Sequence, residues 1–84
     1  MITDKELIEK AEAGDVNSQR ALALLYEIGL DFEMNLERSL HWWVKVAETG
    51  DKLALFSVSE ILQQDEFKND PEKLKKWTDR KSVV

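Results

Sequence analysis

The chain has 84 residues, 43% of them hydrophobic and 35% charged, which corresponds to one small folded domain with a limited core. It contains no cysteine and a single histidine, His41, and this excludes a disulfide scaffold, a thiolate metal site and a two-histidine metal motif. The formal net charge is −5, because residues 1–67 hold 14 acids against 6 bases while residues 68–84 hold 3 acids against 6 bases. We expect no direct binding to a nucleic-acid backbone, because residues 1–67 are acidic and such binding needs clustered Lys and Arg residues.

Helices are expected throughout, because Val, Ile and Thr are scarce and no segment alternates polar with apolar residues for long. Thr3 and Glu6 form a capping-box pattern that predicts the start of the first helix, and Gly14 predicts its end. The second helix is predicted from about Val16 to Gly29, where glycine supplies a left-handed stop. We expect the buried stripes of these two helices to contain Leu7, Ile8, Ala11, Ser18, Leu22, Leu25 and Tyr26.

A loop at residues 30–35 follows, and we expect Leu30 and Phe32 to fold back from it onto the core. Asn35 is placed to cap a third helix, which Gly50 ends. The predicted inner face of this helix consists of Leu36, Ser39, Leu40, Trp43, Val46 and Ala47.

A fourth helix is predicted after Asp51, and a longer joint is expected near residues 65–70. Asp70, Pro71 and Glu72 then predict the start of a fifth helix, because proline in the first turn loses no hydrogen bond and Glu suits the positive end of the helix dipole. Five helices with short joints imply antiparallel neighbours. We expect these last two helices to bury Ala54, Leu55, Val58, Ile61, Leu62, Leu74 and Trp77.

The two tightest joints indicate an internal repeat. Ala11-x-x-Gly14-Asp15 recurs 36 positions later as Ala47-x-x-Gly50-Asp51. A period of this length made of two helices is typical of an α-solenoid. Small residues at equivalent positions, Ala23 and Ser59, are expected to let helices approach closely. Further equivalent pairs are Ser18 with Ala54, Leu22 with Val58, Leu25 with Ile61 and Tyr26 with Leu62.

The first copy resembles a Sel1-like repeat. Its opening half is Gly14-Asp15-x-x-Ser18-Gln19-x-x-Leu22-Ala23-x-Leu25-Tyr26-x-x-Gly29, and its closing half is Asn35-x-Glu37-Arg38-Ser39-Leu40-x-Trp42-Trp43-x-Lys45-Val46-Ala47-Glu48-x-Gly50-Asp51. Residues 51–81 resemble a second copy that keeps Ala54 and Trp77 but has Asp65 where the family has glycine and Leu62 where it has tyrosine.

This resemblance implies a single domain over residues 1–84, with repeat one at about 15–50, repeat two at about 51–81 and one preceding helix. The implied fold is a short right-handed α-solenoid of about five antiparallel helices, similar to tetratricopeptide arrays. Proteins of this family are often bacterial interaction scaffolds or adaptors and generally lack catalytic activity, so the resemblance implies a non-catalytic module without a cofactor.

In a solenoid of this kind, the first helix of each pair lines the concave face, where we expect a partner protein to bind. The expected face holds three apolar residues off the main core stripe, Leu24, Leu53 and Phe56, within a polar rim. Such residues form a groove for a peptide or helix, or else they pack beneath the loop at 30–35 or stand exposed. The full set of candidate partner-binding residues is Asn17, Arg20, Leu24, Glu27 and Ile28 in the first copy, and Leu53, Phe56, Glu60, Gln63 and Gln64 in the second.

No catalytic or metal-binding constellation is expected. His41 sits on the outer face of the third helix without a predicted nucleophile or orienting acid, so we predict a surface histidine. Trp42, Trp43 and Trp77 follow helical spacing and are interpreted as core residues, with an aromatic cage for a cation as the alternative.

Two functions therefore compete. The first is a protein-binding adaptor that uses the concave face. The second is a small acidic inhibitor, such as an immunity protein, antitoxin or anti-defence factor, that blocks a basic effector by charge complementarity. Pairing of two copies through their terminal helices is a further expectation. The basic tail, interpreted as cations that suit a helix C-terminus, contains Lys73, Lys75, Lys76, Arg80 and Lys81.

A membrane partner is not expected, because the longest uncharged run covers only seven positions, Leu53 to Ser59, whereas a spanning helix needs about 20 apolar residues. The start of the chain also lacks the apolar stretch of a signal peptide, so we expect a cytoplasmic protein.

Overall fold

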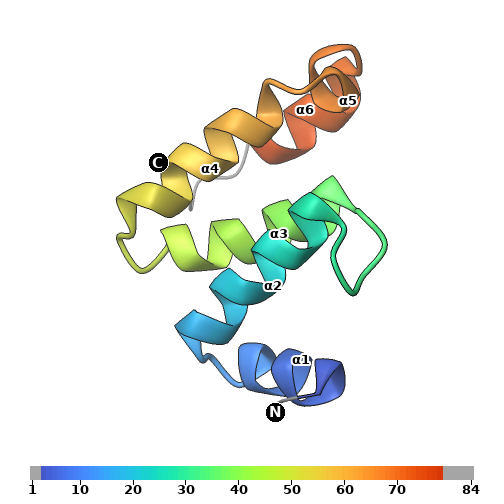
Figure 1. The fold of residues 1–84 in the computed structure, drawn as a ribbon. Coiled ribbons are helices and arrows are strands. Elements are labelled where there is room, and N and C mark those ends of the chain that lie inside the picture. Colours follow the sequence, from blue (N-terminus) through green and yellow to red (C-terminus); the bar gives the residue numbers. More distant parts are fainter. Residues whose placement is uncertain (1–2, 79–84) are drawn as a thin grey trace.

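The computed structural model describes residues 3–78 (Figure 1). Within this range all regular structure is helical, which confirms the all-α class. The elements are α1 (Asp4–Glu12), α2 (Val16–Ile28), α3 (Leu36–Ala47), α4 (Lys52–Leu62), α5 (Asp65–Lys68) and α6 (Pro71–Thr78). The end of repeat two, expected at about residue 81, and the basic residues Arg80 and Lys81 lie outside the described residues.

Local capping explains why the helices begin where they do. The predicted N-cap side chains each accept a hydrogen bond from a backbone N–H in the first turn: Thr3 from Glu6, Asp15 from Ser18, Asn35 from Arg38, Asp51 from Leu53 and Ala54, and Asp70 from Lys73. At the end of α2, Gly29 has φ +75°, a left-handed conformation in which its N–H bonds to the Leu25 carbonyl. The predicted starts of α1 to α4 are therefore confirmed, and α1, α2 and α3 end one to three residues before the glycine predicted to stop each of them.

The number of helices differs from the prediction, because residues 65–70 do not form a plain joint. They contain the four-residue helix α5, whose Phe67 side chain is completely buried. A helix this short shows no 3.6-residue periodicity in the sequence, and it is not stable in isolation. Burial of Phe67 therefore holds α5 in place.

The core is centred on α3, which packs against both α2 and α4. Buried residues lie on most sides of α3. They are Ser39, Leu40, Trp42, Trp43, Val44, Val46 and Ala47. The approach of α2 is close because Ala23 is small and fully buried, and the Ser39 hydroxyl donates a 2.7 Å hydrogen bond to its carbonyl oxygen. The predicted role of Ala23 is thereby confirmed.

Three other expectations about burial are wrong. Ser59, the equivalent of Ala23, is exposed, and Leu55 is 36% exposed, because α6 packs mainly on α5 and does not cover α4 as α3 covers α2. Leu30 is 57% exposed, so only Phe32 folds back from the loop, with its ring 4.8 Å from the Tyr26 ring.

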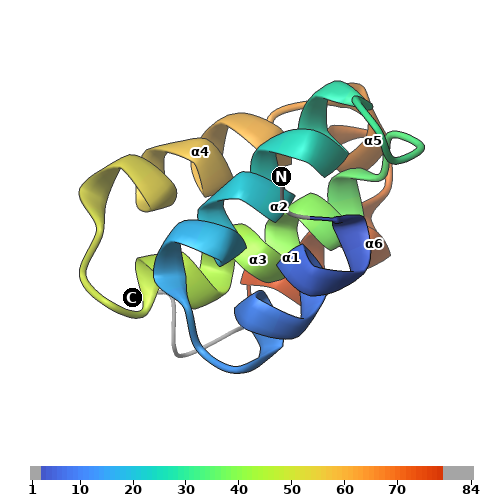
Figure 2. The ribbon, with the colours of Figure 1, turned by 60° about the horizontal axis from the view of Figure 1, so that its bottom comes forward.

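The arrangement of the helices leaves their outer faces open. The main packing contacts join helices that are consecutive in the chain, as expected in a solenoid, and α2 and α4 run in the same direction, opposite to α3 (Figures 1 and 2). Both α2 and α4 therefore have one face that α3 does not cover.

Candidate functional site

The residues predicted to bind a partner lie on the uncovered sides of α2 and α4. Leu24 is 45% exposed, and in α4 Leu53 and Phe56 are 75% and 63% exposed. Asn17, Glu60 and Gln63 are also exposed, while Arg20 and Glu27 are half-buried. These three apolar side chains therefore neither pack beneath the loop at 30–35 nor lie in the core.

An ion pair ties the two helices together at their N-terminal ends. Arg20 Nη2 of α2 lies 2.6 Å from Asp51 Oδ2, the N-cap of α4, and Arg20 Nη1 donates a 3.1 Å hydrogen bond to Asn17 Oδ1. The hydrogen bond from Arg20 lowers the pKa of the Asp51 carboxyl, and the backbone N–H of Ala54 lowers it further. Arg20 thus has a structural role within the predicted face.

Glu27 also has a partner inside the protein, because its carboxylate accepts a 3.0 Å hydrogen bond from the indole N–H of Trp43. This bond satisfies the polar atom of a tryptophan that is only 4% exposed. Trp42 and Trp77 are buried to a similar extent, so all three tryptophans pack in the core and none presents an open ring face for an aromatic cage.

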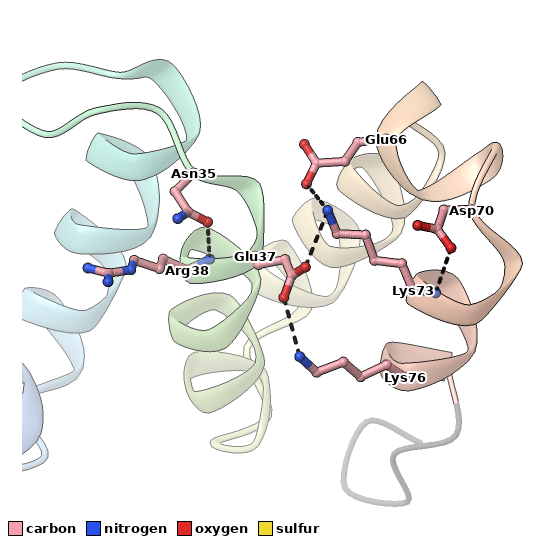
Figure 3. Close-up of polar contacts among 7 residues, drawn as sticks. All are labelled: Asn35, Glu37, Arg38, Glu66, Asp70, Lys73 and Lys76. Atoms are coloured by element: carbon pink, nitrogen blue, oxygen red, sulfur yellow. Dashed lines mark hydrogen bonds and ion pairs between the residues drawn. The ribbon is translucent and has the colours of Figure 1, made fainter.

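A second feature, which the sequence reasoning missed, is a cleft of about 710 Å³ between the first turns of α3 and the α5–α6 segment. Lys73 of α6 lies between two carboxylates here, with Nζ 2.7 Å from Glu66 Oε2 and 3.3 Å from Glu37 Oε1 (Figure 3). Lys76 Nζ lies 3.3 Å from Glu37 Oε2. Arg38 points away from this cluster in Figure 3, toward α2, where its guanidinium lies 5.8 Å from the centre of the Tyr26 ring.

The charges of this cluster balance one another. Desolvation raises the pKa of Glu37, but hydrogen bonds from Lys73 and Lys76 and their positive charges outweigh it, so the pKa lies below its ordinary value. The hydrogen bond to Glu66 raises the pKa of Lys73. We therefore interpret the cluster as a latch that fastens α6 to α3 and α5. Lys73 and Lys76 belong to the predicted basic tail. Lys75 and Lys76 lie in the last turn of α6, as expected for cations near a helix C-terminus, and Lys73 and Lys76 also pair with carboxylates of α3 and α5.

No repeat pattern in the sequence locates the latch. The caps of α3 and α6, Asn35 and Asp70, lie 35 positions apart, so the position equivalent to Glu37 is Glu72 and not Lys73. The pairing of Glu37 with Lys73 therefore depends on how α6 packs against α3.

Other chemistry has little support in the residues that the structure describes. His41 is exposed beside the cleft, with its ring edge-on to Trp42 at 4.9 Å between centroids. Within residues 3–78, no group of three or more His, Asp or Glu side chains is arranged to hold a metal ion. In the same part of the chain, no helix has the length and apolar character needed to cross a membrane.

Comparison with known proteins yields no relative: no family model matches the chain, and the searches of curated proteins and of solved structures return no match. The resemblance to Sel1-like repeats therefore stays a prediction based on the motifs themselves.

Proposed function

We propose that this chain is a non-catalytic protein-binding module built as a short right-handed solenoid of Sel1-like repeats. Its partner binds the concave face of this solenoid, formed by the sides of α2 and α4 that α3 leaves uncovered. We call it the α2–α4 face and define it by Asn17, Arg20, Leu24, Glu27, Leu53, Phe56, Glu60 and Gln63. The observation that carries the proposal is the exposure of Leu24, Leu53 and Phe56, at 45%, 75% and 63%, in a domain too small to spare apolar surface from its core.

The geometry of the α2–α4 face supports this role. Its apolar side chains come from two helices that run in the same direction, and the Arg20–Asp51 ion pair holds the ends of those helices together. Apolar residues presented by rigid elements lose little entropy on binding, so they suit the docking of a helix or peptide.

Affinity capture tests the proposal, with the wild type compared to the double variant Leu24→Glu/Phe56→Glu. A matched control is Leu30→Glu/Met34→Glu, because these two residues are 57% and 59% exposed and lie in the loop before α3. Circular dichroism first establishes that all three proteins have the same helix content. We expect a partner that the wild type and the control retain and the α2–α4 variant loses. Equal retention by all three proteins would refute the α2–α4 face as the binding surface.

A second candidate function is inhibition of a basic effector. It is favoured by the net charge of −5 and by the location of the acidic side chains, none of which is buried within residues 3–78. Electrostatic attraction between the acidic protein and a basic effector accelerates their association and is screened by salt. The inhibitor hypothesis therefore requires an association rate that falls steeply with ionic strength, and a rate independent of salt would contradict it.

A further inference from the structure

The α2–α4 face has a strong charge gradient from one end to the other. In the N-terminal halves of the two helices and at their caps the charges cancel, because Arg20 and Lys52 balance the cap residues Asp15 and Asp51. Beyond the middle of each helix, the two segments 27–35 and 60–66 together hold six carboxylates and no Lys or Arg. Since α2 and α4 run in the same direction, both segments lie toward the same end of the molecule (Figures 1 and 2).

Most of this negative charge is not compensated within the described part of the chain. Among the Lys and Arg residues at positions 3–78, only Lys73 places a nitrogen within 4 Å of any of these six carboxylates, and its partner is Glu66. The nearby cation Arg38 is directed to the Tyr26 ring and hydroxyl group. The C-terminal ends of α2 and α4 add partial negative charges of about half a unit each. A partner segment at this end of the face therefore meets a negative potential.

Apolar surface lies beside this acidic end. Ile28, in the last turn of α2, is 64% exposed, and Leu24 lies one turn before it. Phe56, in the middle of α4, is 63% exposed and lies one turn before Glu60. Apolar contacts and carboxylates are thus offered together, which is the arrangement that recognises an amphipathic segment with cationic residues.

We propose that the occupant of the α2–α4 face is a cationic amphipathic helix of another protein, oriented with its Lys and Arg residues over segments 27–35 and 60–66. This inference rests on the proposed function and adds the chemistry and direction of the partner. A second copy of the chain is the poorer occupant, because it would bring another net charge of −5 against the same acidic surface.

A peptide titration tests the inference. The probe is a fluorescein-labelled peptide of about 14 residues with leucines at helical spacing and lysines at the other positions, and its control has every lysine replaced by glutamine. Fluorescence anisotropy measures the affinity of both peptides for the full chain. We expect the lysine peptide to bind more tightly, and added salt to remove most of the difference.

Two matched pairs of substitutions test whether the carboxylates at the acidic end of the α2–α4 face bind the lysine peptide. Glu60→Gln/Asp65→Asn removes two carboxylates from the acidic end, whereas Glu9→Gln/Glu12→Gln removes two exposed carboxylates from α1 and changes the net charge equally. We expect the first pair of substitutions to weaken binding of the lysine peptide by about threefold to tenfold and the second pair to leave it nearly unchanged.

The outcomes separate this inference from the proposed function. Equal affinity for the two peptides, or equal loss in the two carboxylate variants, overturns the cationic partner while the α2–α4 face stands. Failure of Leu24→Glu/Phe56→Glu to weaken either peptide overturns the α2–α4 face itself. A dimer of the protein alone that this apolar variant dissociates, measured by light scattering, would make a second copy the occupant and also overturns the inference.

Discussion

Two phenylalanines in adjacent helices offer a sharp test of how this small domain is held together. Phe67 of α5 is completely buried, whereas Phe56 of α4 is 63% exposed. Replacing Phe67 by alanine leaves a cavity and removes the contact that holds a four-residue helix, which has no stability of its own. Truncation of a buried Phe costs about 3–5 kcal/mol. A domain of this length has a free energy of unfolding of about 4–12 kcal/mol, so Phe67→Ala removes a large share of it.

Urea unfolding followed by circular dichroism measures the difference, with Phe56→Ala as the matched control. We expect Phe67→Ala to lower the free energy of unfolding by about 3 kcal/mol or more, and Tm by at least about 12 °C. Phe56→Ala makes the same chemical change at the surface and should stay within about 0.5 kcal/mol of the wild type. A loss below about 1 kcal/mol for Phe67→Ala, or an equal loss for both variants, would refute the assignment of α5 to the core.

Two further predictions concern polar contacts. The pKa of Glu37 is lower in the folded protein than its ordinary value of 4.5, so its contribution to stability is complete above that pH and is lost as the pH falls through the folded value. Glu37→Gln should therefore make the urea midpoint depend less on pH below 4.5. The control Glu9→Gln, at an exposed position in α1, should leave the pH dependence of the urea midpoint unchanged. The same pH dependence in both variants would contradict the latch. Ser39→Ala leaves the buried carbonyl of Ala23 without the hydroxyl donor and should destabilise the protein by about 1–2 kcal/mol in the same assay, while no change would show that this bond contributes little.

The sequence predicts the helix starts well because each depends on a few neighbouring residues. Asp15, Asn35 and Asp51 each cap a helix through a side chain that reaches a backbone N–H two or three positions later. Such contacts are independent of the rest of the fold. The predicted core of α3 is confirmed for the same reason, since the 3.6-residue period alone places Leu40, Val46 and their neighbours on one face.

Burial outside α3 was harder to predict, because it depends on which helix covers which. Val44 is buried although it lies off the predicted stripe, since both α2 and α4 pack against α3. Leu55 and Ser59 are exposed because α6 packs mainly on α5, which the sequence pattern did not predict. The ion pair between Glu37 and Lys73 likewise joins residues far apart in the chain, and no local pattern predicts it.

The difference between the two copies of the repeat bears directly on function. In the first copy, Arg20 pairs with Asp51 and contributes to the structure. At the equivalent position, 36 residues later, the second copy has Phe56, which is 63% exposed and is not part of the core cluster. A polar side chain there would satisfy the solvent-facing position of α4 without exposing aromatic surface. Neither core packing nor helix propensity favours phenylalanine at such a position, so the exposure of Phe56 supports the proposal that it contacts a partner.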